Sequence, residues 1–303
     1  MADALLAAPP NVALVGGVRA KRQDTNAKRQ ASLWAIIAIG QTFVIITGGI
    51  DLSVGSVIAF SGVFIAVLLR DTGLHPLAVF ALLLMLTTAF GAGMGFLIDR
   101  LAMPAFIVTL GTMGIFRSLV TWLADGGTLS LDYGLRTLYR PVYYGGIGWL
   151  TWPIITFAVV AVLGEWVMRH SRFGRHVEAI GSNDRVARYS GIDVNRVRLL
   201  TYVGLGMLVG LAVVLYVPRL GSASGSTGVL WELEAIAAVI IGGTALKGGR
   251  GRVWGTVVGV LILSLIDNIL NLADLVSPYL NGAIQGVIIV LAVVLQREKR
   301  AAE

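Results

Sequence analysis

The acidic side chains that stand in or beside long apolar runs are the groups of this chain best placed to do chemistry. They are Asp51, Glu165, Glu232, Glu234, Asp267 and Asp274. A carboxylate at the centre of a membrane costs roughly 2.5 to 3.5 kcal/mol, so such groups usually face protein or a water-filled cavity. One interpretation is therefore a path for a substrate or for protons. The other is that each carboxylate lies at a helix end and reaches the membrane surface.

For some of these acidic residues, the position along the apolar run favours the second interpretation, in which the carboxylate reaches the membrane surface. Glu165, Glu232 and Asp274 lie near the ends of such runs, so we expect them to reach the surface. Asp51 and Asp267 leave both interpretations open.

For Asp51 a third interpretation is preferred. It stands in the stretch ITGGIDLSVGSVIAFSG, residues 46–62. The Gly-Gly pair would end one helix, and the oxygens of Asp51 and Ser53 would accept hydrogen bonds from the exposed N–H groups that begin the next one. The sequence thus predicts a helix break that Asp51 caps.

Other kinds of chemistry are excluded by what the sequence lacks. The chain has no cysteine, and its histidines, His75, His170 and His176, are too scattered for a zinc site. It lacks the phosphate-binding motif GxxxxGK[ST], which LKGGRGR at 246–252 does not match, and the nucleophile motif GxSxG. We predict no catalytic, cofactor-binding or metal-binding residues, and we expect a protein that is not an enzyme and does not itself hydrolyse ATP.

The composition predicts an integral membrane protein. Of the 303 residues, 56% are apolar and 14% are charged, whereas a soluble domain has about 25% charged residues. The net charge of +7 does not indicate nucleic-acid binding, because the Lys and Arg residues lie between or just beyond the apolar runs, as in membrane proteins with basic cytoplasmic loops.

The apolar runs predict an all-α, polytopic membrane helix bundle of about nine spans, since a helix needs about 20 apolar residues to cross the hydrocarbon layer. Residues 1–31 are broken by Pro9 and Pro10 and are expected to form a polar, disordered tail. The transmembrane domain covers 32–298, and 299–303 is a C-terminal tail. The expected spans are 32–50, 54–70, 77–98, 104–124, 150–170, 199–219, 233–246, 253–273 and 276–295.

Charge predicts the orientation of these spans. An even number of spans separates the Arg-rich loop 171–198 from the basic turn 247–252 and from the basic tail 296–300, so all three can be cytoplasmic. The poorly charged loops 125–149 and 220–232 then lie outside. Nine spans also put the N-terminal tail outside, although it holds several basic residues, so either a further span precedes residue 32 or one of the short spans is wrong.

The loop 171–198 is the most informative polar stretch. Ser182 or Asn183 is a good helix N-cap, Asp184 would stand in the first turn, and Gly191 can end the helix in a left-handed turn. We therefore predict a short, solvent-facing helix from about Asn183 to Ser190. It is either a solvated connector or a projection that receives force from a cytoplasmic partner.

The chain resembles the permeases of ribose- and xylose-type sugar importers in the ATP-binding-cassette superfamily, from about residue 31 to residue 300. The resemblance is carried by five ordered motifs: TGGIDLSVGS (47–56), PAFIVTLGTM (104–113), EAIGSNDRVARYSGI (178–192), ELEAIAAVIIGGTALKGGRGRVWGTVVG (232–259) and DNILNL (267–272).

This resemblance implies a multi-pass permease of the bacterial inner membrane. Its partners would be a second permease subunit, identical or not, an ATPase subunit at the cytoplasmic face and a periplasmic sugar-binding protein. The residues that match the ATPase-coupling loop of the family are Glu178, Gly181, Asn183, Arg185, Arg188 and Gly191. Those that match its signature or core segments are Gly49, Asp51, Ser53, Gly55, Glu234, Gly242, Gly243, Asp267 and Asn268.

One departure and two alternatives accompany this resemblance. Members of the family usually have ten spans, with a further span before the position of Ser32, where this chain has the polar stretch 1–31. A transporter driven by an ion or proton gradient, with Asp51 and Asp267 as carriers, is one alternative. A related cassette permease for branched-chain amino acids is the other. The sugar, the path that it follows and the pairing of subunits are not readable from the sequence.

Overall fold

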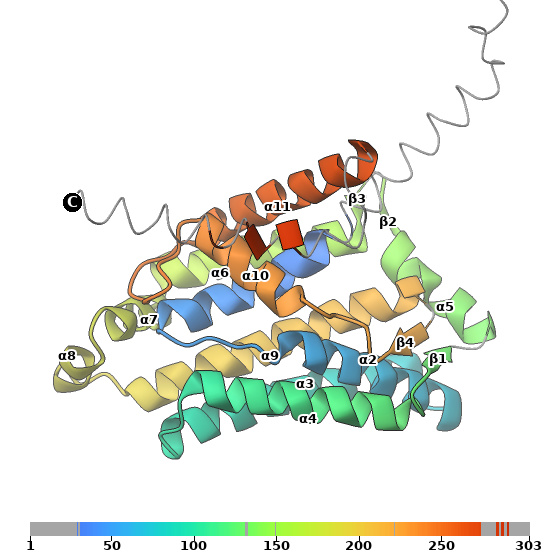
Figure 1. Cartoon of the computed structure of the whole chain (residues 1–303), viewed down its shortest axis with the longest axis horizontal. Helices are drawn as coiled ribbons and strands as arrows, with labels where there is room; N and C mark the ends of the chain where they lie inside the picture. The colour runs from blue at the N-terminus through green and yellow to red at the C-terminus, as the bar shows by residue number, and fades with distance from the viewer. Residues whose placement is uncertain are drawn as a thin grey trace, which may run out of the picture.

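A nearly completely buried helix, Ala31–Ile46, runs through the middle of the molecule. The computed structural model describes residues 29, 31–130, 133–148, 150–220 and 222–273, together with 283, 284, 286, 287 and 290 (Figure 1). The sequence of this helix is apolar on every side, which is the pattern of a helix surrounded by others. Leu33, Ile36 and Ile45 are fully buried in it.

Within the described part of the chain, five of the surrounding helices are long and apolar enough to cross a membrane, as predicted. Four have nearly the predicted bounds, whereas α9 begins at Val194 rather than at residue 199. The five are α2 (Val54–Asp71), α3 (Pro76–Arg100), α4 (Ala105–Leu123), α6 (Trp152–His170) and α9 (Val194–Leu220).

Prolines place several of these helix starts. Pro76 is the first residue of α3, where its missing N–H costs nothing, and the preceding His75 accepts a hydrogen bond from the Leu77 N–H. Pro104 directly precedes α4, and Pro153 lies in the first turn of α6. These residues fix φ at a helical value before the apolar run begins.

Glycines allow α3 and α9 to pack against each other closely. A Cβ on Gly91 of α3 would overlap the backbone oxygen of Tyr202, and one on Gly206 of α9 would overlap that of Thr87. In lipid, apolar area gives no driving force between helices, so close backbone approach at small residues has to supply it. Gly91 and Gly206 each stand four residues before another glycine, Gly95 and Gly210, that also faces the partner helix, so this spacing marks the faces that cross.

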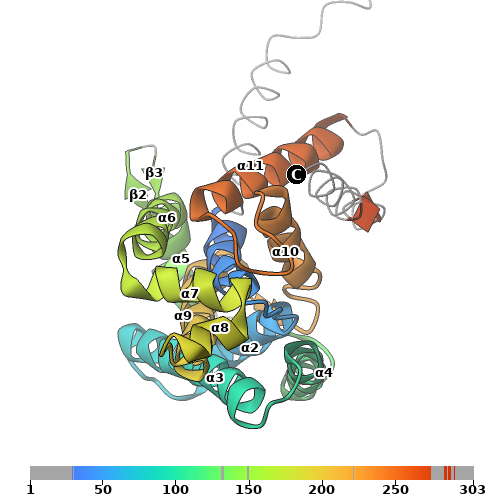
Figure 2. The same ribbon diagram turned by 90° about the vertical axis from the view of Figure 1, so that its left-hand side faces the viewer.

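The polar segments gather at the two opposite ends of the bundle (Figures 1 and 2). The short helices α7 (Arg172–Ser182) and α8 (Asp184–Tyr189) lie at one end. At the other, β1 (Thr128–Ser130) pairs antiparallel with β4 (Ser222–Ser224), and β2 (Gly146–Ile147) pairs with β3 (Leu150–Thr151). The segment 125–149, predicted to be an irregular loop, also contains the helix α5 (Tyr133–Tyr144). Arg29 lies over the rings of Tyr143 and Tyr144, so the buried helix Ala31–Ile46 starts at this same end.

The C-terminal part of the described chain corrects one predicted span. The span expected at 233–246 is the eleven-residue helix α10 (Trp231–Ile241), which Gly242 ends. At 1.5 Å per residue it is about 16 Å long, which is too short to cross about 30 Å of hydrocarbon. Helix α11 (Val253–Ala273) follows, and the span predicted at 276–295 lies almost entirely outside the described residues.

Candidate functional site: a surface helix tied to the membrane core

The helix α8 forms as its sequence predicts. Asn183 is its N-cap, with its side-chain oxygen accepting the Val186 N–H at 3.1 Å. Asp184 stands in the first turn, where the helix dipole favours a negative charge. The helix ends before Gly191, which has a φ of +80° that side chains rarely adopt.

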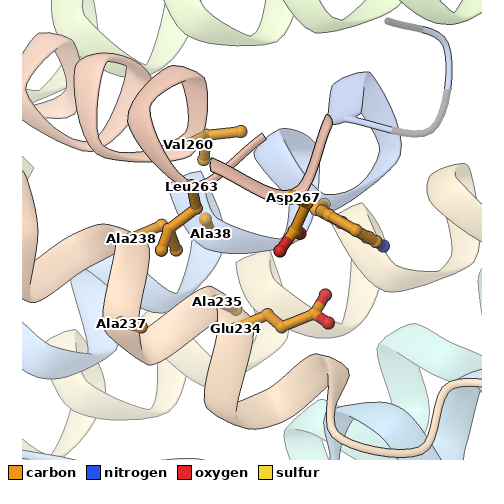
Figure 3. A pocket seen from close by; sticks show the side chains of 9 residues that line it. Ala38, Glu234, Ala235, Ala237, Ala238, Val260, Leu263 and Asp267 are labelled. Atoms are coloured by element: carbon orange, nitrogen blue, oxygen red, sulfur yellow. The ribbon is translucent and has the colours of Figure 1, made fainter. Parts of the chain in front are cut away.

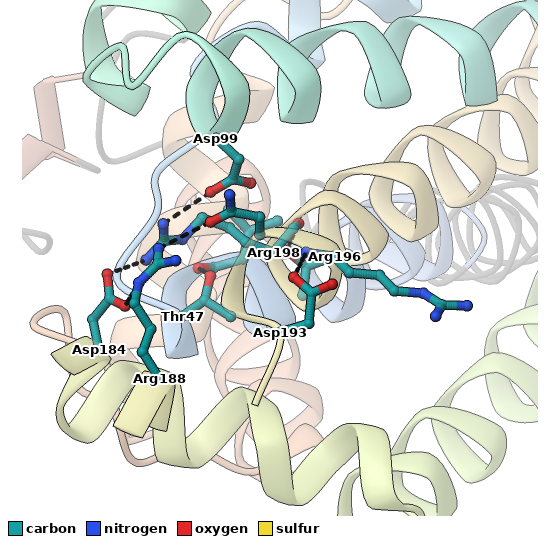
Figure 4. A network of polar contacts seen from close by, with 10 residues as sticks. Thr47, Asp99, Asp184, Arg188, Asp193, Arg196 and Arg198 are labelled. Carbon is teal, nitrogen blue, oxygen red and sulfur yellow. Dashed lines mark hydrogen bonds and ion pairs between the residues drawn. The ribbon is translucent and has the colours of Figure 1, made fainter. Parts of the chain in front are cut away.

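An ion-pair network connects α8 to two long helices (Figure 4). Arg198 of α9 donates to Asp99 of α3 at 2.9 Å and to Asp184 of α8 at 3.4 Å. The side chain of Asp99 is 2% exposed and that of Arg198 is 20% exposed, so this pair is shielded from water. Arg188 closes the network with bonds to Asp184 and to Asn195 of α9, each at 2.9 Å.

The outer face of α8 carries exposed side chains. Tyr189 is 91% exposed and Val186 57% exposed, while Ala187 is buried against the bundle. Arg185 is exposed as well. An exposed aromatic beside exposed arginine is the composition that anchors protein interfaces. The sequence prediction named Arg185 for this surface but missed Tyr189.

The helix α7 fixes α8 against the end of the buried helix. A Cβ on Gly181 would overlap the backbone oxygen of Ile46 and the N–H of Gly249. The Gly249 N–H in turn donates to that Ile46 oxygen at 2.9 Å. Loop 171–198 and turn 247–252 therefore lie together at one face, as the charge pattern predicts. Glu178 of α7 is partly exposed at this face.

The predicted helix break at Asp51 is present, but the role of the carboxylate needs correction. The buried helix ends at Ile46, and Gly48 follows it with a φ of +81°. Asp51 is 1% exposed, and it accepts the N–H of Ser53 at 2.8 Å and its hydroxyl at 2.6 Å. Ser53 occupies the N-cap position of α2. Asp51 therefore orders the loop before the helix rather than capping the helix N–H groups.

The residues around this break hold several elements together. The Gln41 side-chain amide donates to the backbone oxygen of Asp51 at 3.2 Å. Gly49 lies directly beside the hydroxyl of Tyr202 in α9. A Cβ on Gly55 would overlap the carboxylate of Glu232, which is therefore packed against the first turn of α2.

Two carboxylates expected to reach the membrane surface are instead buried inside protein. Glu165 and Glu232 are 6% and 8% exposed. Glu165 of α6 accepts the Trp254 N–H, in the first turn of α11, at 3.2 Å and forms an ion pair with Arg169. Glu165 therefore supplies the hydrogen-bond acceptor for an N–H group in the first turn of α11. Its position in the sequence does not reveal this partner. Asp274 lies outside the described residues.

Two signature acids line one small pocket (Figure 3). Glu234 of α10 and Asp267 of α11 point into the same space, which Trp34 of the buried helix also lines. The remaining lining is mainly alanine and aliphatic. Asn268, the neighbour of Asp267, is partly exposed on α11.

The signature glycines sit where α10 meets α11. A Cβ on Gly242 would overlap the backbone of Gly255, and Gly243 has a φ of +88°. Both positions therefore require glycine, one for a close backbone contact and one for the turn that stops α10.

The described residues thus form a bundle of membrane-length helices with a polar helix fixed to one end, which is the architecture of a multi-pass membrane protein. The chain belongs to the family described as the permease component of branched-chain amino acid transport systems, whose model matches residues 25–293.

Relatives within this range have more specific names. The ribose import permease protein of Bacillus subtilis is 40% identical over 280 residues, which cover 91% of this chain and 85% of that protein. An inner membrane ABC transporter permease protein of Escherichia coli is 39% identical, covering 93% of this chain and 85% of the relative. The xylose transport system permease protein of Haemophilus influenzae is 33% identical, covering 97% and 93%. No solved structure matches the chain.

Proposed function

We propose that this chain is the membrane-spanning permease of an ATP-binding-cassette importer that carries a monosaccharide, a ribose-like pentose or a related sugar. The sugar class rests on the ribose and xylose permeases among the relatives. The coupling to a separate ATPase rests on one observation, the fixed helix α8 with its exposed Tyr189 and its ion-pair link to α3 and α9.

In this proposal the ATPase subunit docks on α8 at the cytoplasmic face of the bacterial inner membrane. A periplasmic binding protein delivers the sugar at the opposite end, where α5 and the two strand pairs lie. A second permease subunit completes the translocation path. Closure of the ATPase dimer would move α8, and α3 and α9 would follow because the network joins them, so that the path opens alternately to each side. The permease itself performs no chemistry.

Uptake into proteoliposomes tests this function. The permease is reconstituted with the ATPase subunit and the binding protein of its importer, and uptake of labelled ribose, xylose and leucine is measured with and without enclosed ATP. We expect pentose uptake that requires ATP and persists when ion and proton gradients are collapsed. Uptake without ATP that follows a gradient would contradict the proposal, and ATP-driven uptake of leucine alone would move the substrate class to amino acids.

A further inference from the structure

A groove on the side of the bundle has part of the buried helix Ala31–Ile46 as its floor. Its volume is about 560 Å³, and its walls are α6 and α9. Ile39, Gly40 and Phe43 of the buried helix form its floor. Apolar side chains such as Val159, Leu163 and Leu208 make up most of the lining, so the groove suits a hydrocarbon occupant.

The α9 wall of the groove is about as long as one leaflet of a bilayer is thick. On α9 the lining runs from Leu200 to Leu211, which at 1.5 Å per residue is about 17 Å. This is close to half of a hydrocarbon core about 30 Å thick. The floor residues 39–43 lie in the half of their helix that ends near α7. The α6 wall continues further outward, to Trp152, but the floor does not. If a membrane-spanning helix occupied the groove, the part of it in the other leaflet would therefore have no floor residues to pack on.

Basic residues stand at the α7 end of the groove. Phe173 of α7 lines this end and stacks on Phe43 with ring centroids 6.1 Å apart. Arg172, directly before it, is exposed. Arg196 is also exposed and lies one helical turn before the lining residue Leu200, so both are on the same face of α9. Figure 4 shows the Arg196 side chain extending away from the Asp99–Arg198 network.

We propose that the groove binds one anionic phospholipid of the cytoplasmic leaflet. An acyl chain lies along the partly exposed Phe43 and the exposed Val159 and Leu163 of α6. The phosphate of the headgroup lies beside Arg196 and Arg172. Charge complementarity selects this occupant, because the cytoplasmic leaflet carries anionic lipids and basic pockets between transmembrane helices bind their headgroups.

Native mass spectrometry of the purified, delipidated full-length chain tests the proposal directly. Equal amounts of phosphatidylglycerol and phosphatidylcholine are added, and the lipids that remain bound are identified. We expect one tightly held lipid, with phosphatidylglycerol preferred at least about fivefold, the factor expected for one arginine near the membrane surface.

Two pairs of variants locate the lipid. Gly204→Leu places a side chain in the groove, where an added Cβ meets no atom within 4 Å, and should abolish the tightly held lipid. Gly93→Leu adds the same side chain at an equally open position of α3 and should leave binding unchanged. Arg196→Gln should lower the preference for phosphatidylglycerol about fivefold while an acyl chain still binds. Arg100→Gln, at the same end of α3, should not.

The proposal has clear contrary outcomes. It is overturned if the wild type shows no headgroup preference, or if the Gly204 and Gly93 variants retain lipid equally. It is also overturned if Gly204→Leu changes the ratio of dimer to monomer but not the bound lipid, because the groove would then hold a second copy of the chain. Should Gly204→Leu fail to fold, Met207→Trp fills the same groove from an exposed lining position and carries the same expectations.

Discussion

The guanidinium of Arg198 lies 2.9 Å from the carboxylate of Asp99, joining two helices across 99 residues of sequence. Because the Asp99 side chain is 2% exposed, its charge depends on compensation inside the protein, chiefly from Arg198 and to a smaller extent from Arg188. Arg198 also reaches Asp184 of α8, so the surface helix and the bundle share one cation.

Replacing Arg198 with Ala should therefore uncouple ATP hydrolysis from sugar uptake. The change leaves a buried carboxylate without its cation, which costs about 3 to 5 kcal/mol in typical cases, and the α8–α3 link is lost. Uptake should fall at least about tenfold while the ATPase subunit still hydrolyses ATP in proteoliposomes. The double variant Arg198→Ala with Asp99→Ala removes the uncompensated charge and should restore folded yield but not coupling. Full uptake by the double variant would show that the ion-pair network is not needed for coupling.

Replacing Tyr189 with Ala should weaken docking of the ATPase subunit. Tyr189 is 91% exposed and makes no contribution to the buried core, so the permease should fold normally. Truncation of an interface aromatic costs about 2 kcal/mol or more, which corresponds to a loss in affinity of about thirtyfold. Co-purification of the permease with the ATPase subunit measures this loss of affinity. Tyr144→Ala, at the opposite end of the bundle, is the control, and equal co-purification of both variants would contradict the assignment.

Substitution at Gly191 or Arg188 should also reduce uptake with the protein still folded. Gly191 has a φ of +80°, so Gly191→Ala costs roughly 1 to 2 kcal/mol in the turn that ends α8 and shifts the helix. Arg188→Ala removes the bonds to Asp184 and Asn195. The check is the ratio of transported sugar to hydrolysed ATP, with Gly111→Ala, an open position on α4, as the control. An unchanged ratio in both variants would show that α8 does not couple.

Asp51→Ala should lower the yield of folded protein more than it changes sugar preference. It leaves the buried N–H of Ser53 without its acceptor, which costs about 1 to 3 kcal/mol, and leaves the hydroxyl only the weak acceptor Met94 Sδ at 3.1 Å. Asp51→Asn keeps a side-chain acceptor and should recover most of the yield. Size-exclusion chromatography in detergent measures the yield, and competition between sugars measures the preference. Normal yield with altered preference would instead place Asp51 on the sugar path.

Gly91→Leu should disrupt the crossing of α3 and α9. The added side chain would overlap the backbone oxygen of Tyr202, which cannot move without shifting the whole helix. We expect a destabilisation of about 1 to 3 kcal/mol or more, seen as a lower unfolding temperature. Gly93→Leu adds the same side chain two residues away, where nothing lies within 4 Å, and should be nearly neutral. Equal effects of the two variants would show that the crossing is looser than described.

Much of the fold could be predicted because its signals are local. Apolar runs bounded by proline and charge place the long helices, and the spacing of Gly91 and Gly206 with their neighbours identifies faces that pack. Asn183 and Gly191 predict both ends of α8 for the same reason. Each of these features depends on residues within one or two turns.

The errors arose where a local signal was overlooked or where the deciding partner is distant. Helix α5 was missed, although Tyr139 and Tyr143 stand four residues apart and are both buried, which is a helical spacing. The burial of Glu165 depends on the start of α11, 89 residues further on. The partner of Arg198 likewise belongs to another helix, so neither pairing could be read from sequence spacing.

The pairing of β1 with β4 has a mechanical consequence for access from the outside. The two strands join the chain that follows α4 to the chain that follows α9, and Arg117 of α4 adds bonds to the backbone oxygens of Gly225 and Thr227 at 2.6 and 2.9 Å. At that end, α4 and segment 222–227 must therefore travel together as one rigid block. In the proposed orientation, an aperture toward the outside would form along the border of this block and not through it.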